Sequence, residues 1–321
     1  MTGPIFTTLA AEWAQHAATA GFDVVPYAVP FFVLTIVIEM VWAARRAPTA
    51  YEPQDTRTSL LMGLGSTVAG GLVGGLIALA AGWLFAHRLI GIPAAWWARP
   101  DACAALWIGV FLLDDANYYA FHRSAHRVRW FWASHVNHHS SQHYNLSTAL
   151  RQTWTGFPAQ SFAFRIWPAL IGVPPGMLLT VGGINLVYQF WIHTEAIDRM
   201  PRWFEAVMNT PSHHRVHHAT NPRYLDRNYA GVFIIWDRLF GTFQPELRED
   251  PVRYGIVHQL ATFSLTTVAF HEWAGIARDL WHAPWPAKLG YVIRVPGWTH
   301  DGSRDTSDMI RARWLAGQDD G

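Results

Sequence analysis

The feature that most restricts the fold of this chain is the stretch Leu60–Ala86, which contains no charged residue. At about 1.5 Å per residue, a helix of this length crosses the ~30 Å hydrocarbon core of a bilayer. An earlier apolar stretch, Val25–Ala44, is interrupted only by Glu39 and is followed by Arg45 and Arg46. Two such stretches in succession predict a pair of transmembrane helices rather than the buried helices of a soluble domain.

The composition agrees with a membrane protein. Hydrophobic residues make up 51% of the 321 residues and charged residues only 15%, against about 25% charged residues in ordinary soluble chains. The 18 tryptophans are expected where aromatic side chains gather at membrane interfaces. A net charge of +1 gives no indication of nucleic-acid binding. The single cysteine, Cys103, excludes an internal disulfide and any paired-cysteine metal or redox site.

Further apolar stretches follow. Ala104–Phe121 predicts a third transmembrane helix, although it contains Asp114 and Asp115, which are costly at membrane depth. Phe162–Leu170 and Met177–Ile192 are separated by Gly-Val-Pro-Pro-Gly, a turn signal. These two stretches predict a helical hairpin, residues 162–192, that enters the membrane and returns to the same side.

The expected fold is therefore an all-α integral membrane protein with about four to five transmembrane helices. The positive-inside rule places the loop with Arg45, Arg46 and Arg57 in the cytoplasm, which puts the segments after the third helix and after the hairpin on that side too. After Gly241 the chain alternates aromatic, apolar and basic residues, which predicts short amphipathic surface helices.

Histidines cluster in those cytoplasmic segments. The chain has 17 histidines, and three short motifs, HRSAH, HVNHH and HHRVHH, place them three or four residues apart. Residues with that spacing share one face of a helix, so each motif can direct two or three imidazoles at one point. Isolated histidines are usually surface or core residues, and we expect this of those outside the motifs: His16, His87, His258, His271, His282 and His300.

Eight or nine imidazoles exceed the about four to six ligands that one ion takes, so the motifs predict two metal ions close together. Neutral imidazole suits iron, zinc, copper and nickel. Side chains near the motifs are candidates to hold ligand imidazoles by hydrogen bonds. These candidates are Asp114, Asp115, Asn145, Glu195, His213, Asp226 and Asn228. Arg215, inside the last motif, is expected to pair with Asp226 or Asp237 or to face lipid phosphate.

Other metal and catalytic chemistries fit less well. The chain has no Glu-x-x-His motif of soluble di-iron bundles, no His-Glu-x-x-His zinc motif, no Gly-x-Ser-x-Gly and no phosphate-binding loop. A haem site would need axial histidines within the membrane, whereas these motifs lie outside it. The non-enzyme alternative is a histidine-rich metal transporter, although such loops are usually irregular in spacing.

The three motifs, in this order around a hydrophobic hairpin, resemble the fatty acid hydroxylase and sterol desaturase superfamily, which has the pattern HxxxH, HxxHH and HxxHH. The flanking stretches 138–152, 189–195 and 209–243 are similar to the alkylglycerol monooxygenase branch and its bacterial relatives. The resemblance covers roughly residues 104–245. Where that branch usually has an acidic residue after the serines, this chain has Gln142 and His143, and whether His143 or His213 binds metal is left open.

The resemblance implies a di-iron, O2-dependent oxygenase whose all-histidine site lies in a cytosolic helical cap. The implied ligands are His122, His126, His135, His138, His139, His214, His217 and His218, with His193 of the QFWIHTE stretch as the ninth. Zinc can replace iron on heterologous expression. No haem-binding cytochrome b5 domain is fused to the chain, so the electrons come from outside. The donor is left open among a reduced pterin, a cytochrome b5 and a ferredoxin.

The predicted organisation has three parts: N-terminal transmembrane helices and an interfacial loop (1–103), the catalytic core (104–245), and C-terminal surface helices with a polar tail (246–321). We expect an integral protein of the bacterial inner membrane, with its active site on the cytoplasmic side, that hydroxylates a C–H bond of a lipid. Ether-lipid oxidation is one candidate reaction. The alternative is a desaturase or hydroxylase of a sterol, hopanoid, carotenoid or ornithine lipid.

Overall fold

The computed structural model describes residues 15–16 and 18–317, and this part of the chain is helical with no strand. Two isolated β bridges, Met208–Phe233 and Ala219–Tyr254, are its only strand-like pairs. The longer helices are α2 (Val25–Arg46), α3 (Pro53–Ala86), α5 (Pro100–Arg127), α9 (Pro175–Trp191), α13 (Leu265–His282) and α15 (Ser307–Leu315). The shorter ones are α4 (Ala94–Ala98), α6 (Arg129–Trp132), α7 (Val136–His139), α8 (Ala163–Ile166), α10 (Arg202–Glu205), α11 (Pro211–His217), α12 (Ile235–Leu239), α14 (Gly290–Ile293), and the 3-10 turns η1 (Thr148–Leu150), η2 (Trp167–Ile171) and η3 (Trp285–Ala287).

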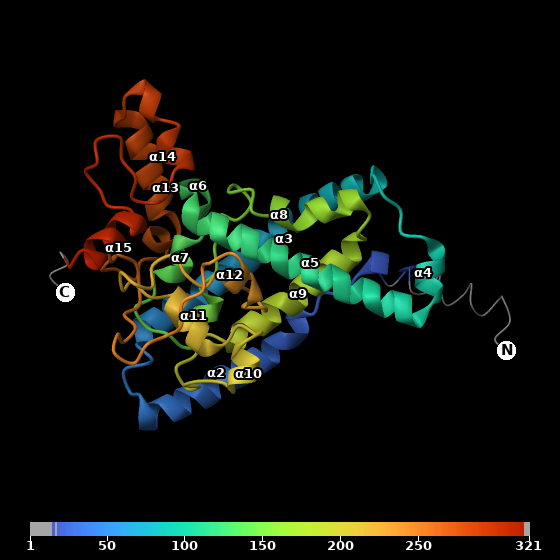
Figure 1. Cartoon of the computed structure of the whole chain (residues 1–321), viewed down its shortest axis with the longest axis horizontal. Coiled ribbons are helices and arrows are strands. Elements are labelled where there is room, and N and C mark those ends of the chain that lie inside the picture. The colour runs from blue at the N-terminus through green and yellow to red at the C-terminus, as the bar shows by residue number, and fades with distance from the viewer. Residues whose placement is uncertain (1–14, 17, 318–321) are drawn as a thin grey trace.

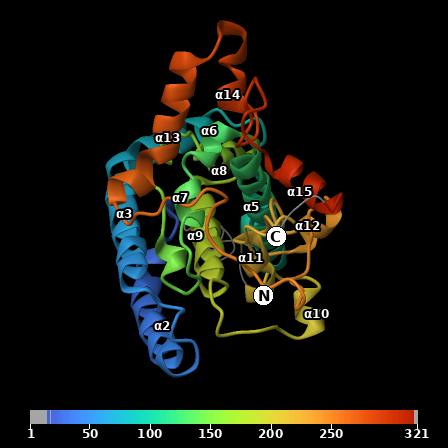
Figure 2. The ribbon, with the colours of Figure 1, turned by 90° about the vertical axis from the view of Figure 1, so that its left-hand side faces the viewer.

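The long helices α2, α3, α5 and α9 run along the length of the molecule, and the short helices α6, α7, α11 and α12 lie toward one end of it (Figure 1). Figure 2 looks onto that end, where α7 and α11 lie among the ends of α3, α5 and α9. These four short helices therefore form a cap on the long ones, at the end opposite α4. The C-terminal helices α13, α14 and α15 lie on this cap.

Two of the described helices, α2 and α3, are long and apolar enough to cross a membrane, with hydropathies of 1.9 and 2.0. Their apolar side chains are largely exposed, for example Leu72 at 80% and Leu79 at 72%. Apolar surface on this scale is expected to face lipid rather than water. The protein is thus a membrane protein in which these two helices are the clear candidates for spans, and the expected total of four to five remains a prediction.

The predicted hairpin has two unequal arms. Its first arm is only the short helix α8 followed by η2, because Pro168 and Gly172 interrupt the helix, Gly172 with a φ of +94°. Its second arm is α9, with 17 residues. At about 1.5 Å per residue the first arm is too short to cross a bilayer, and entry of the hairpin into the membrane stays a prediction.

Two glycines of α3 allow the chain after the second histidine motif to approach closely. A Cβ on Gly63 would lie 2.6 Å from the Leu150 carbonyl oxygen, and one on Gly65 would clash with the Trp154 indole. The Trp154 Nε1–H also donates to the Met62 carbonyl at 2.9 Å. The contact of α2 is similar, since its Phe32 and Ile36 pack on Leu146 beside Phe190 of α9. Both membrane helices thus support the cap directly.

Candidate metal centre

The three motifs and His193 bring nine histidines into the centre of the cap. The last two turns of α5 provide His122 and His126, and the one-turn helix α7 with the residue before it provides His135, His138 and His139. His193 follows the end of α9, α11 provides His214 and His217, and His218 directly follows α11. Eight of the nine are buried, and His135 is partly buried.

These side chains form two groups, in each of which the ligand atoms lie within 4.8 Å of one another. The five-histidine group consists of His122, His126, His135, His139 and His217. The four-histidine group consists of His138, His193, His214 and His218. The predicted convergence of distant histidines on two neighbouring centres is therefore present in the structure, and every predicted ligand belongs to one of the centres.

The ring nitrogens within each group lie as close to one another as nitrogens that bind the same metal ion. In the five-histidine group, the His135 Nε2 lies 2.9 Å from the His122 Nε2 and 3.1 Å from the His139 Nε2. In the four-histidine group, the His193 Nε2 lies 3.2 Å from the His138 Nε2 and 3.0 Å from the His214 Nε2. Nitrogens about 2.0–2.1 Å from a metal ion are roughly 3 Å apart along the edges of its coordination shell.

Backbone carbonyls hold several rings from the other side. The Nδ1–H of His122 can donate to the Tyr229 carbonyl at 2.8 Å, and that of His193 to the Gln189 carbonyl at 2.8 Å. His138 and His217 have corresponding contacts with the carbonyls of Arg151, at 3.3 Å, and Arg227, at 3.0 Å. A proton held on Nδ1 leaves the Nε2 lone pair directed at the centre of the group, which is the arrangement that a metal requires.

Some inward-facing nitrogens have no hydrogen-bond partner among the described residues. These are the buried Nε2 atoms of His126, His217 and His218. Buried polar atoms nearly always have a partner, and a metal ion is the partner that would satisfy these lone pairs. The donor set therefore fits two metal ions.

The rings are held in the neutral form that binds metal. Burial, together with the neighbouring histidines, lowers the pKa of His135, His139 and His214 well below the usual value for histidine. Burial lowers the pKa of His193 to about 4. At neutral pH these imidazoles carry no positive charge that would compete with a bound cation.

Asp226 holds an imidazole, as predicted. Its carboxylate lies 3.4 Å from the His126 Nδ1, and Arg127 contacts its other oxygen at 3.2 Å. Burial opposes ionisation of this carboxyl, but the hydrogen bond with His126 and the charge of Arg127 outweigh it and lower the pKa of Asp226. An ionised carboxylate on the outer nitrogen makes the imidazole a stronger metal ligand.

Asn228 has a different function from the predicted one. It shares a loop with Asp226, and both adopt left-handed backbone conformations, with φ of +55° and +56°, which Asn and Asp tolerate better than most residues. The Asn228 side chain donates to the carbonyl oxygens of His213 and Gln244. It therefore fixes the loop whose carbonyls, at Arg227 and Tyr229, face the ligand rings.

Asp114 and Asp115 contact other residues around the site rather than the histidine rings that they were predicted to hold. Asp115 accepts hydrogen bonds from the backbone of Val232 and Phe233 and from the Trp236 indole. Asn185 donates to both carboxylates. These contacts join α5 to α9 and to the segment before α12, and no described contact reaches a histidine ring.

The remaining candidates lie around the groups without joining them. Asn145 closes its own turn through Ser147, and Glu195 accepts from the Tyr254 hydroxyl at 2.9 Å. His143 contacts the Thr49 carbonyl, and the His213 ring lies against Phe243, so neither histidine belongs to a group.

Arg215 pairs with a carboxylate, as expected from the sequence, but the carboxylate is that of Glu246, at 2.7 Å, rather than that of Asp226 or Asp237. Its guanidinium also donates to the backbone carbonyls of Thr194 and Ile197. The reason is the position of the side chain, which is buried under the segment that follows His193.

A cavity of about 270 Å³ lies between the five-histidine group and the C-terminal helices. His126, His139 and His217 line one side of it, and Arg129, Glu272, Arg304 and Asp305 are among the residues of the other side. Its charged wall distinguishes this cavity from the apolar surface of α2 and α3.

Comparison with known proteins gives a consistent result. Residues 107–242 match the family model described as fatty acid hydroxylase. An alkylglycerol monooxygenase from Xenopus tropicalis is 39% identical over 281 residues, which cover 86% of this chain and 60% of the relative. More distant relatives include an ornithine lipid hydroxylase from Rhizobium tropici, 26% identical over 49% of this chain and 47% of the relative. Another is cholesterol 25-hydroxylase from Homo sapiens, 25% identical over 68% of this chain and 80% of the relative.

The chain spans about 60% of the length of the alkylglycerol monooxygenases from Xenopus tropicalis and Homo sapiens. No solved structure is significantly similar to it.

Proposed function

We propose that this chain, whose residues 107–242 match the fatty acid hydroxylase family model, is a membrane-bound, O2-dependent di-iron monooxygenase that hydroxylates a lipid. One observation carries the proposal: nine histidines form two adjacent groups of closely spaced imidazoles in a cap on the apolar helices α2 and α3. The relatives are monooxygenases and hydroxylases, which supports an oxidoreductase of this kind.

The five-histidine and four-histidine groups would each hold one iron ion. Iron bound in this way supplies the activation of O2 that an unreactive C–H bond requires. The overall reaction consumes the substrate C–H bond, one O2, two electrons and two protons, and it yields an alcohol and one water. The electrons come from an external donor, and a reduced pterin, a cytochrome b5 and a ferredoxin all remain candidates.

The protein contributes position and shielding. The carbonyls of Tyr229, Gln189 and Arg151 and the carboxylate of Asp226 orient the imidazoles. Burial of the rings keeps bulk water away from the centre, which limits side reactions of activated oxygen. The apolar helices at this end of the molecule provide a surface along which a lipid chain can approach.

The cytoplasmic side is the proposed location of the cap. Arg45 and Arg46 end α2, and the short loop after them leads to Asp55 in the first turn of α3, which contacts Arg151 of the cap. These arginines therefore lie at the same end as the histidines, and the positive-inside rule assigns such an end to the cytoplasm. An inner-membrane protein with about four to five spans is the arrangement we propose.

An ether lipid of the alkylglycerol type is the proposed substrate, because the alkylglycerol monooxygenases are the more similar relatives. Hydroxylation or desaturation of a sterol, hopanoid, carotenoid or ornithine lipid is the alternative, supported by the more distant relatives. A histidine-rich metal transporter is the non-enzyme alternative, and the carbonyl-held rings weigh against it because transport requires ligands that release the ion.

Lipid analysis of cells that express the wild type, His138→Ala or His143→Ala tests the proposal. His138 belongs to the four-histidine group and His143 to neither group, so His143→Ala is a matched control. We expect a lipid heavier by one oxygen with the wild type and with His143→Ala but not with His138→Ala. A transporter would instead change the cellular metal content and leave the lipids of all three strains the same.

Purified wild type should hold close to two metal ions per chain, including zinc when iron is scarce.

A further inference from the structure

Two buried carboxylates lie on the candidate membrane helices. Glu39 is in the middle of α2 and is 6% exposed, and Asp55 is in the first turn of α3 and is 2% exposed. Both lie outside residues 107–242, the part of the chain that matches the family model. An ionisable group within a membrane helix is costly, and it is usually retained because its partners serve function.

Glu39 connects α2 to two segments of the cap. One of its oxygens accepts the Tyr51 hydroxyl at 2.5 Å and the backbone N–H of Leu146 at 2.7 Å. The other accepts the hydroxyl of Thr194, the residue that follows His193. Because Thr194 directly follows His193 in the chain, this hydrogen bond fixes the backbone next to that predicted ligand.

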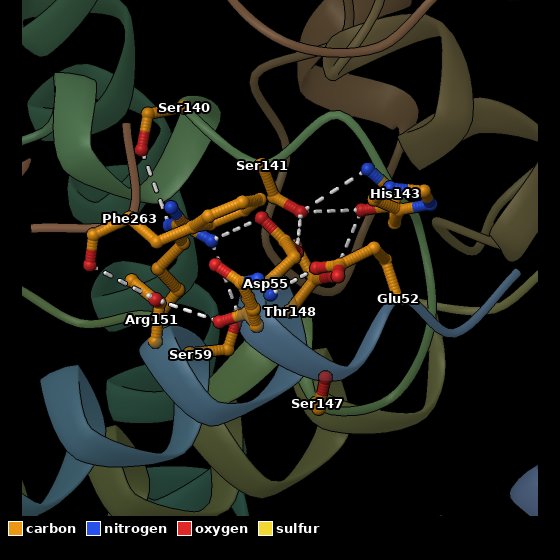
Figure 3. A network of polar contacts seen from close by, with 12 residues as sticks. Glu52, Asp55, Ser59, Ser140, Ser141, His143, Ser147, Thr148, Arg151 and Phe263 are labelled. Atoms are coloured by element: carbon orange, nitrogen blue, oxygen red, sulfur yellow. Dashed lines mark hydrogen bonds and ion pairs between the residues drawn. The ribbon is translucent and has the colours of Figure 1, made fainter. Parts of the chain in front are cut away.

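Asp55 makes a corresponding connection from α3. One oxygen pairs with the Arg151 Nη1 at 2.8 Å, and the other accepts the hydroxyl of Ser141 (Figure 3). The Arg151 Nε donates to the Ser140 hydroxyl at 3.1 Å, so the guanidinium joins Asp55 of α3 to the residue that follows His139. The carbonyl of the same Arg151 faces the Nδ1 of His138 at 3.3 Å. Asp55 therefore holds the residue that holds His138.

The connection from Glu39 leads to the four-histidine group. The connection from Asp55 leads to His138 of that group and also, through Ser140 and Ser141, to the residues that directly follow His139 of the five-histidine group. His193 and His138 belong to the four-histidine group, and their Nε2 atoms lie 3.2 Å apart. The described carboxylate that contacts a ring of the five-histidine group is Asp226, which lies within the family-matched domain. Neither Glu39 nor Asp55 has a described hydrogen bond to a residue of the 226–229 loop.

We infer that Glu39 is a positioning residue through which α2 holds His193, so that α2 is required for the ion of the four-histidine group and not for that of the five-histidine group. Asp55 of α3 is a positioning residue for His138 and for the chain that follows His139, and so supports both ions. The inference rests on the proposed dimetal site. It assigns the N-terminal helices a second function besides membrane anchoring, which is to hold the metal-binding histidines.

Cobalt(II) titration of the full-length protein in lipid nanodiscs tests the inference. After removal of metal by chelation, Co²⁺ is added without oxygen, and its ligand-field absorption reports each binding step. The wild type should bind two ions. Glu39 and Thr194 act on His193 without bonding its ring, so in Glu39→Gln and Thr194→Val one step should weaken about threefold to tenfold, less than the about 10–100-fold for loss of a group that bonds a ligand ring directly, while the other step stays within twofold. In Asp55→Asn both steps should weaken. Thr35→Val is the control on α2, because its hydroxyl bonds only within the helix, to the carbonyls of Phe31 and Phe32.

The affected ion is identified by combination with His214→Ala, which removes a ligand of the four-histidine group. In that background Glu39→Gln should leave the remaining binding step unchanged, since residues of one unit are not additive. Circular dichroism and gel filtration show whether each variant is folded. A folded Glu39→Gln protein that keeps both affinities, or loses both equally, would contradict the inference. A wild type that binds no pair of ions would instead refute the proposed dimetal site.

Discussion

The two histidine groups are built from similar ligands but are supported by different parts of the chain. The five-histidine group is held by one continuous loop, residues 226–229, which supplies a carboxylate to His126 and carbonyls to His217 and His122. The four-histidine group is held from three directions, by α9 through Gln189 and by α2 and α3 through Glu39 and Asp55. The difference indicates that the groups bonded directly to rings of the five-histidine group lie within the family-matched domain, whereas the supports of the four-histidine group include Glu39 of α2.

Removing one ligand from each group gives the largest effect and shows whether the groups bind separate ions. His217→Ala should remove the ion of the five-histidine group and His214→Ala that of the four-histidine group. Either variant should lower lipid hydroxylation by more than the about 10–100-fold expected for a group that only orients a ligand. Metal analysis should give close to one ion per chain for each single variant and none for the double variant. If either single variant lost both metal ions, the two groups would form one site that binds its ions together.

Asp226→Asn is the counterpart, for the five-histidine group, of the change at Glu39. The amide keeps the shape of the side chain but loses the negative charge on the His126 Nδ1–H. Affinity for one Co²⁺ should fall about 10–100-fold, and the binding step that is unchanged should be the one that Glu39→Gln weakens. Titration of Asp226→Asn, Glu39→Gln and the double variant checks this. If both single variants weaken the same binding step, the inference that different residues hold the two histidine groups is wrong.

The ligands could be predicted from the sequence because their spacing contains the information. Histidines three or four residues apart in three motifs have few purposes other than metal binding, and Asp226 could be proposed because its carboxylate follows the last motif. The secondary structure was less predictable: α7 has four residues and α11 seven, so the helical spacing reflects single turns.

The supports of the rings could not be predicted for a physical reason. Four rings are held by backbone carbonyls, those of Arg151, Gln189, Arg227 and Tyr229. Every residue has a carbonyl, so the residue type carries no signal. Asp55 resembles an ordinary acidic residue in the first turn of a helix, and Glu39 stood out only as an interruption of an apolar stretch. Their partners lie about a hundred residues away, and only the fold brings them together.

Asp237→Asn tests a support that is one step further from the five-histidine group. The Asp237 carboxylate accepts the backbone N–H groups of Tyr229 and Ala230, both at 2.8 Å, and so fixes the carbonyl that faces His122. The amide cannot accept both bonds, which leaves a buried donor unsatisfied at a cost of about 1–3 kcal/mol. We expect that loss in thermal or denaturant stability. Because the ring itself keeps its partner, Co²⁺ affinity should fall only about threefold to tenfold, less than the about 10–100-fold for Asp226→Asn. An effect on the four-histidine group as large as that on the five-histidine group would contradict this order.

Asp308→Ala gives the smallest expected effect and marks the outer limit of the support around the five-histidine group. Asp308 of α15 accepts from Arg127 at 2.6 Å, and Arg127 in turn contacts Asp226. The pair is half exposed, so its contribution to stability is about 0.2–1 kcal/mol in water, and Co²⁺ affinity should change less than twofold.

The hydrogen bond from Arg127 lowers the pKa of Asp308. A lowered carboxyl pKa means that the contribution is complete above the ordinary value of about 3.9 and is lost as pH falls below it. The difference in stability between wild type and Asp308→Ala should therefore be constant from pH 5 to 8 and should disappear in acid. A difference that persisted at about pH 2 would show that α15 is held by packing rather than by this ion pair.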